Sequence, residues 1–330
     1  MLGAGSRCLS IFTHALNARV LRAYEKGPLS YQELDRVFGW APQSSLRAAL
    51  NSLRDLGAIQ RLEGGTTAPG GPHALTAAGH DLLPVAGALE RWLEQAPEGP
   101  VSLEDTAAFG TIRVLIAGWD STVVRELAEE PQTLVQLSAK IPGTTYPALK
   151  RRLSKLRSTQ MVVPVKTPHG TAYEASEWLR EAVAPFVLAG RWERRHDAEA
   201  IPISRVEVEA AFLLTLPLIE LPARSSGACA LAVLTPQAKD RTERNTAGVT
   251  VEIERGKLAS CSTATSAQGT WALGSIDAWL DATIDGNADS LRFNGANPRL
   301  AENIVKGVHD ALFPSRATRD VQKTRQASMP

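Results

Sequence analysis

The chain has 330 residues, a length typical of two or three domains that each bury a core. Apolar residues make up 44% and charged residues 22%, as in soluble globular proteins, and no apolar run approaches the roughly 18 residues of a membrane span. The first residues lack the layout of a signal peptide, and three widely spaced cysteines favour reduced thiols in a cytosol. We therefore expect a cytoplasmic protein that does not enter a membrane.

The net charge of +1 hides an uneven distribution along the chain. Residues 140–195 contain eleven Lys or Arg and four Asp or Glu, a net charge of +7. Residues 201–314 contain ten and thirteen, a net charge of −3. A basic segment of this kind is the electrostatic footprint that a polyanion requires.

The first hundred residues predict the elements of a winged helix-turn-helix in order. A capping box of Ser30 and Glu33 opens the second helix, Pro42 opens the third, and Gly57 ends it. A glycine-rich loop at 64–72 separates two short strands as a wing would, and Trp92 lies near the end of a long apolar helix that must pack on another element. The predicted helices cover 9–26, 30–38, 42–57 and 75–96, and the predicted strands cover 59–63 and 73–75.

The third helix has an outward face that could read bases. Its members are Ser44, Arg47, Ala48 and Asn51. Asn can pair bidentately with adenine and Arg with guanine. Arg61 follows on the first strand of the predicted wing, so our DNA-contacting set in this copy is Ser44, Arg47, Asn51 and Arg61.

These residues resemble the HxlR-type winged-helix transcriptional regulators. The most specific part of the resemblance is an "LT-x-x-G-x-x-L-x-P…W" pattern that begins at Leu75-Thr76 and ends at Trp92. The resemblance covers 9–96 well and 109–195 more loosely, since the later segment keeps Trp192 but not the "LT-x-x-G". Regulators of this type are homodimers in which each subunit places one recognition helix, so two copies in one chain depart from the pattern.

The second copy lies 103 residues after the first, beyond a linker at 97–100. Leu46, Leu50 and Leu53 fall on Leu149, Leu153 and Leu156, the apolar seam of a short helix. Basic side chains point away from this seam, and a strand over 162–165 leads to a second wing loop at 166–171. The predicted DNA contacts of this copy are Tyr146, Lys150, Arg151, Ser154, Lys155 and Lys166. An ordinary solvated basic helix is the alternative interpretation.

From residue 201 the pattern predicts an α+β domain: a helix over 206–218, four strands, a helix, a strand and a last helix. The order resembles the sterol-carrier-protein lipid-binding fold, through Ala278-Trp279-Leu280, Asp285-Gly286 and residues 291–295. That resemblance implies an apolar cavity for a hydrophobic small molecule. The same residues would equally fill an ordinary core. The candidate pocket residues are Phe212, Leu216, Trp271, Trp279 and Phe293.

Motifs for catalysis, metal binding or phosphate binding are missing from the sequence. No Gly-Lys-Ser/Thr follows a glycine-rich stretch, and the six histidines are scattered without metal-ligand spacing. His73 and His169 lie near the predicted wings, where phosphate contact is the more natural role. We therefore expect neither an enzyme nor a resident cofactor or metal.

Together these patterns predict a multidomain regulator with two tandem winged helix-turn-helix domains, mainly α with small β wings, and an α+β sterol-carrier-like domain. Its expected partners are double-stranded DNA and an apolar effector, bound by a homodimer or by a monomer whose copies form an intrachain pseudo-dimer. A small-molecule binding or sequestering protein, or a pathway enzyme, that has lost DNA binding is the alternative function. The predicted divisions are 1–97, 98–200, 201–314 and a disordered tail at 315–330.

Overall fold

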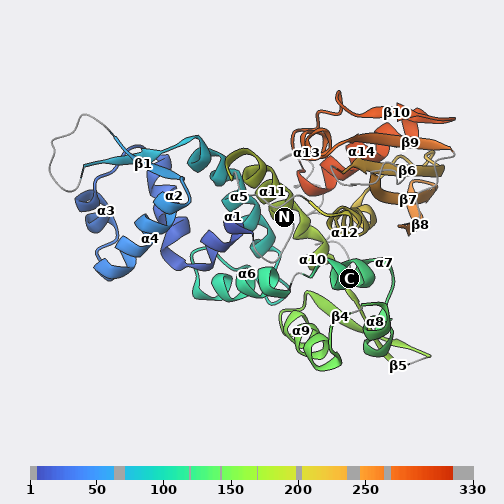
Figure 1. Cartoon of the computed structure of the whole chain (residues 1–330), viewed down its shortest axis with the longest axis horizontal. Helices are drawn as coiled ribbons and strands as arrows, with labels where there is room; N and C mark the ends of the chain where they lie inside the picture. Colours follow the sequence, from blue (N-terminus) through green and yellow to red (C-terminus); the bar gives the residue numbers. More distant parts are fainter. Residues whose placement is uncertain are drawn as a thin grey trace. The chain divides into compact units, whose positions relative to one another are not determined.

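A computed structural model of the chain describes residues 6–62, 71–118, 120–141, 143–168, 170–197, 203–235, 246–263 and 269–314. Most of the predicted first wing loop, His169, the predicted boundary at 198–202 and the predicted tail lie outside these residues. The fold is mixed α/β, with helical elements toward the N-terminus and a five-stranded sheet toward the C-terminus (Figure 1). Contacts group the chain into two units. One contains Met1–Asp120, Arg151–Gln160 and Pro185–Ile201, and the other contains Ser121–Lys150, Met161–Ala184 and Pro202–Pro330.

The elements of the first unit follow the predicted order. Helix α2 packs on α4 and α5, and strands β1 and β2 pair antiparallel with Ile59 opposite Leu75. The capping box of Ser30 and Glu33 is formed, and Pro84 is accommodated inside α5. The elements are α1 (Arg7–Ser10), η1 (Ile11–Thr13), α2 (Ala15–Glu25), α3 (Tyr31–Val37), α4 (Gln43–Asp55), β1 (Ile59–Arg61), β2 (His73–Leu75), α5 (Ala77–Glu94) and α6 (Thr106–Gly118).

The predicted first helix is broken at His14, so a continuous helix over 9–26 is wrong. His14 has an extended backbone, with φ of −121° and ψ of 128°. The Asn17 side chain stabilises the break, because its Nδ2 donates to the carbonyl of Ile11 at 2.8 Å. A side chain that bonds a nearby carbonyl in this way competes with the helical hydrogen bonds.

Helix α11 (Val183–His196) contacts α5 (Ala77–Glu94), so the long apolar helix that was expected to pack on another element does so. Trp192 Nε1 donates to the carbonyl of Ala78 at 2.7 Å, and His196 Nε2 lies 2.7 Å from Oδ2 of Asp81. Ala182 separates α11 from the short helix α10 (Glu177–Glu181).

Two helices of the first hundred residues recur 103 residues later with equivalent bounds. Helix α3 corresponds to α8 (Leu134–Lys140) and α4 to α9 (Tyr146–Ser158). The Thr133 and Gln136 capping box repeats that of Ser30 and Glu33. The elements between α6 and α10 are α7 (Ser121–Glu129), β3 (Gln132–Thr133), α8, α9, β4 (Val162–Thr167) and β5 (Gly170–Ala175).

The spacing falls from 103 to 100 after the hairpin, which is also the spacing of Trp92 and Trp192. Thr76 caps α5 by accepting from the Gly79 N–H, and Ser176 caps α10 by accepting from the Leu179 N–H. The Thr76 hydroxyl also donates to the carbonyl of Gly57, shortly before β1. The Ser176 hydroxyl donates in the same way to the carbonyl of Met161, just before β4. The three-stranded sheet has the order β3-β5-β4.

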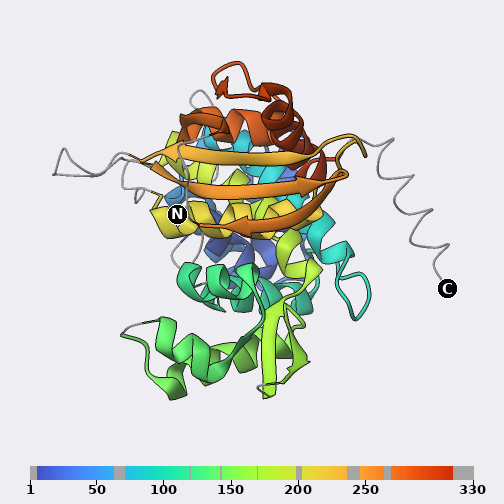
Figure 2. The same ribbon diagram turned by 90° about the vertical axis from the view of Figure 1, so that its right-hand side faces the viewer.

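The C-terminal part of the second unit is a five-stranded sheet covered by helices on one face. The strand order is β10-β9-β6-β7-β8, and only the central β6 and β9 pair in parallel. Helices α12, α13 and α14 pack on this sheet, which Figure 2 shows face on with strands in front of α12 and α13. The elements are α12 (Arg205–Thr215), η2 (Leu216–Leu218), β6 (Gly227–Leu234), β7 (Thr246–Glu254), β8 (Lys257–Ser262), β9 (Thr270–Ser275), α13 (Ile276–Asp285), β10 (Arg292–Asn294) and α14 (Pro298–Leu312).

A buried charge network joins α12 to α7 within the second unit. Arg125 on α7 pairs with Glu209 on α12 at 3.0 Å and with Glu126 at 2.6 Å. The Glu209 and Glu126 side chains are 1% and 6% exposed, so both carboxylates depend on these partners. Arg180 on α10 adds a second connection, since it donates to the carbonyls of Leu213 and Ala128.

No single described helix has the length and apolar character to cross a membrane. Thr106–Ala117 and Ser121–Glu129 reach that length and composition only when they are taken together.

Candidate nucleic-acid interface

The buried side of α4 fixes which residues face outward. Leu46, Ala49 and Leu53 are at most 3% exposed, and α4 packs on α2 through this side. Positions at about 100° intervals then place Ser44, Arg47 and Asn51 on the opposite side, where all three are exposed. The structure therefore brings three of the four DNA contacts predicted in the first copy onto one face of one helix.

Two of these side chains already have partners. Arg54 Nη2 donates to Oδ1 of Asn51 at 3.0 Å, and the Arg47 guanidinium lies over the Tyr31 ring, 5.6 Å from its centroid. Bidentate pairing of Asn51 with adenine needs that same oxygen as an acceptor, so Arg54 must first release it. These contacts hold the side chains in place but oppose the predicted base contact.

Sequence reasoning missed a basic cluster at the base of the first wing. Arg61 lies opposite His73 in the β1–β2 register, and both Arg61 and Arg54 are close enough to His73 for their charges to affect it. Burial lowers the pKa of His73, and the positive charges of Arg54 and Arg61 lower it further. Arg54 ends the recognition-helix candidate and Arg61 ends the first strand, so the hairpin register was the signal that would have found the cluster. A phosphate group is the natural ligand for the two arginines of this cluster.

Helix α9 presents more positive charge than α4. Leu149, Leu153 and Leu156 are at most 3% exposed, which leaves Tyr146, Lys150, Arg151, Ser154 and Lys155 exposed as predicted from the helical spacing. Within the described part of the chain, no ion pair engages Lys150, Arg151 or Lys155. Cations without carboxylate partners are free to exchange counterions for phosphates.

The neighbouring charges of α9 have a structural role instead. Arg152 pairs with Asp120, which directly precedes α7. Gln160 follows the helix with a positive φ of 57° and donates from Nε2 to Glu98 at 3.2 Å. These contacts engage Arg152 and the turn after α9, and they leave Lys150, Arg151 and Lys155 without ion pairs among the described residues.

Lys166 is exposed on β4, which pairs with β5 in the register Lys166 opposite Thr171. It therefore stands near the tip of the second hairpin. His169, the other wing residue expected to meet phosphate, lies outside the described residues.

The five predicted pocket residues divide between the two faces of the C-terminal sheet. Phe293 lies opposite Ala272, which is fully buried beneath the helices, whereas Trp271 is the strand neighbour of Ala272 and points to the other face. Phe212 and Trp279 meet edge to face on the helical side, with ring centroids 5.0 Å apart, and Leu216 is fully buried. The arrangement brings Phe212 and Trp279 together and leaves Trp271 on the face without helices.

Thiol and metal chemistry has little support in the described residues. They contain no group of three or more His, Cys, Asp or Glu side chains that could hold a metal ion. The three cysteines are free thiols, and burial raises the pKa of Cys229 and, together with the charge of Glu129, that of Cys261 to about 12. A thiol with so high a pKa is a poor nucleophile at neutral pH.

Comparison with curated proteins gave no match for this chain. Among protein families, residues 12–99 match the one described as HxlR-like helix-turn-helix. The matched residues run from η1 through α5 and the turn after it, and so contain α4 and the first hairpin. Residues 12–99 therefore form an HxlR-like helix-turn-helix domain, which supports a DNA-binding regulator of the HxlR type.

Proposed function

We propose that the protein is a transcriptional regulator that binds double-stranded DNA with two recognition helices, α4 and α9. The observation that carries the proposal is the unpaired basic face of α9 at the position that corresponds, 103 residues later, to the helix of the matched HxlR-like domain. The repeated caps at Ser30 and Thr133 support the same geometry in both copies. On this proposal α9 supplies most of the phosphate contacts, and Arg47 and Asn51 of α4 contact base edges.

The test is the salt dependence of DNA binding by the full chain. Fluorescence anisotropy with a duplex from the protein's own promoter region gives the affinity at several salt concentrations. Each phosphate contact adds about 0.9 to the slope of log affinity against log salt, so the double variant Arg151→Ala/Lys155→Ala should lose about 1.8 of that slope. Its affinity should fall for all sequences alike.

A matched control removes two exposed cations elsewhere. Arg224 and Lys257 are both exposed in the C-terminal part of the chain, so Arg224→Ala/Lys257→Ala changes the net charge equally. Its slope should stay at the wild-type value. If the α9 variant folds normally and keeps both its affinity and its slope, α9 is not a DNA-binding helix.

We further propose that the C-terminal domain senses an apolar small molecule on the helical side of its sheet. Phe212 and Glu209 lie on the same helix, α12, one near Trp279 and the other paired with Arg125 of α7. A ligand that displaces α12 would therefore disturb α7 as well. A ligand changes DNA affinity only if it binds two conformations unequally.

The neutral apolar dye Nile red provides a probe for this domain in the full chain. Enhanced dye fluorescence that is competed by lipids, polyketides or aromatic compounds, together with a changed DNA affinity, would support a sensor. A domain that gives no response across that panel is a structural or dimerising module instead.

A further inference from the structure

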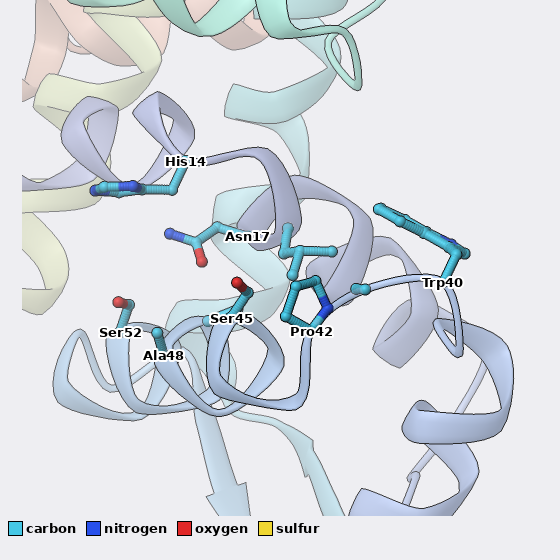
Figure 3. A pocket seen from close by; sticks show the side chains of 10 residues that line it. His14, Asn17, Trp40, Pro42, Ser45, Ala48 and Ser52 are labelled. Atoms are coloured by element: carbon cyan, nitrogen blue, oxygen red, sulfur yellow. The ribbon is translucent and has the colours of Figure 1, made fainter.

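A cavity of about 370 Å³ lies in the HxlR-like domain between the start of α2, the turn before α4 and one side of α4 (Figure 3). From α4 it is lined by Ser45, Ala48, Ala49 and Ser52, which recur at i, i+3, i+4 and i+7. Their small side chains leave the space that larger residues would fill. The volume is within the range of small-molecule sites.

The floor of the cavity contains a polar group that lacks a partner. Asn17 is 2% exposed, and its Nδ2 is committed to the carbonyl of Ile11. No donor among the described residues reaches its Oδ1. Figure 3 shows the carboxamide between His14 and Ser45, with its oxygen toward α4. An unpaired carbonyl oxygen that lines a cavity can accept a hydrogen bond from an occupant.

The opposite wall is aromatic and held in place. The guanidinium carbon of Arg19 lies 4.8 Å from the centroid of the Trp40 ring, and Phe38 meets Trp40 edge to face at 6.5 Å. Leu16, Ala41 and Pro42 complete an apolar lining. The indole is 61% exposed and so stands at the rim of the cavity, where a flat ring can lie against it, since aromatic pairs gain from offset or edge contact.

The lining also excludes a charged ligand. None of the ten lining residues is Asp, Glu, Lys or Arg. The remaining polar groups are the Ser45 and Ser52 hydroxyls and the His14 imidazole, which can orient a neutral ligand from the rim.

We propose that this cavity binds an uncharged, planar aromatic molecule that donates an N–H or O–H hydrogen bond to Oδ1 of Asn17. The occupant lies against the flank of α4 next to its outward face, because Ala48 belongs both to the cavity lining and to the predicted DNA-contacting face. A bound molecule there alters how α4 meets DNA. This last consequence rests on the proposed function, whereas the binding itself does not.

The proposal can be tested in the absence of DNA by comparing the binding of benzamide and methyl benzoate to the cavity. The two have similar shapes, but only benzamide donates a hydrogen bond. Binding is followed by the indole N–H signal of Trp40 in the full ¹⁵N-labelled chain, assigned with Trp40→Phe. Benzamide should shift this signal with a dissociation constant on the order of millimolar, as expected for so small a ligand. Methyl benzoate should bind about fivefold more weakly, because it leaves Asn17 unpaired.

Two variants of α4 locate the binding. Ser52→Phe fills the cavity and should abolish the shift, whereas Ser44→Phe places the same side chain on the outward face and should leave it unchanged. No shift of the Trp40 signal at the solubility limit of benzamide would overturn the proposal. Equal affinities for benzamide and methyl benzoate would also overturn the proposal, and this comparison uses only the wild-type chain. Both outcomes leave the salt test of α9 unaffected, so the two proposals can fail separately.

Discussion

The charge network between α7 and α12 gives the sharpest prediction for stability, through the substitution Arg125→Met. Burial by itself lowers the pKa of Arg125, but hydrogen bonds to Glu126 and Glu209 outweigh it and raise the pKa. The favourable interaction of the guanidinium with the two carboxylates therefore exceeds the desolvation cost of its burial. Methionine keeps much of the packing volume and removes the charge.

The loss should be smaller than that of a fully buried ion pair. Removing one partner of such a pair costs about 3–5 kcal/mol, because it leaves an uncompensated charge. Here Arg205 still contacts Glu209 at 2.6 Å and Lys140 still contacts Glu126 at 3.4 Å. Arg205 is 63% exposed, however, and exposed pairs contribute about 0.2–1 kcal/mol. We expect Arg125→Met to lower the local opening free energy by about 2–3 kcal/mol.

Native-state hydrogen exchange can measure this loss in the elements concerned. Peptides from α7 and α12 should lose protection together, while peptides from α4 keep theirs. In a double-mutant cycle, Glu209→Gln should cost much less in the Arg125→Met background than in the wild type. Additive effects of the two substitutions, or loss of protection in α7 alone, would refute the reasoning that one network holds both helices.

Three further changes test other parts of the chain. Gly79→Ala should destabilise the HxlR-like domain by about 3 kcal/mol in urea unfolding, because the added Cβ would meet the carbonyl of Ala58, whereas Gly87→Ala in the same helix should be neutral or stabilising. Burial and the charge of a neighbouring glutamate raise the pKa of Glu181 to about 7 from 4.5, so the folded chain holds this proton more tightly than the unfolded chain. The unfolding free energy should therefore fall by up to about 3 kcal/mol as the pH rises from 4.5 to about 7. Glu181→Gln should flatten the pH dependence of the unfolding free energy. If the dependence persists in this variant, another group causes it. Asn51→Ala should relax sequence preference in a binding-site selection more than it lowers non-specific affinity, and an unchanged motif at equal stringency would contradict base reading by α4.

Local signals made much of the fold predictable from the sequence. The Ser30 cap and the apolar seam of α9 depend on residues only three or four positions apart, so spacing alone places them correctly. The match of Leu46 with Leu149 carried the bounds of α4 onto those of α9.

Features that depend on distant partners were not predictable in this way. The break at His14 is stabilised by the hydrogen bond from the Asn17 carboxamide to the carbonyl of Ile11. The helical spacing of apolar residues does not predict this bond. The face taken by Trp271 follows from strand register, which a run of apolar residues does not specify. The cavity beside Asn17 arises where three segments meet, and the clustering of Arg54 with His73 requires the hairpin to be formed.

If both α4 and α9 bind DNA, as proposed, carrying the two helices in one polypeptide has a consequence for how the target site can change. In a homodimer, one codon change alters both recognition helices at once, and pairing weakens as the protein is diluted. Here Asn51 corresponds to Ser154, and Arg47 to Lys150, at positions that mutate independently. Covalent linkage also makes the second engagement intramolecular at any cellular abundance. Proteins of this design can therefore acquire asymmetric target sites one half at a time.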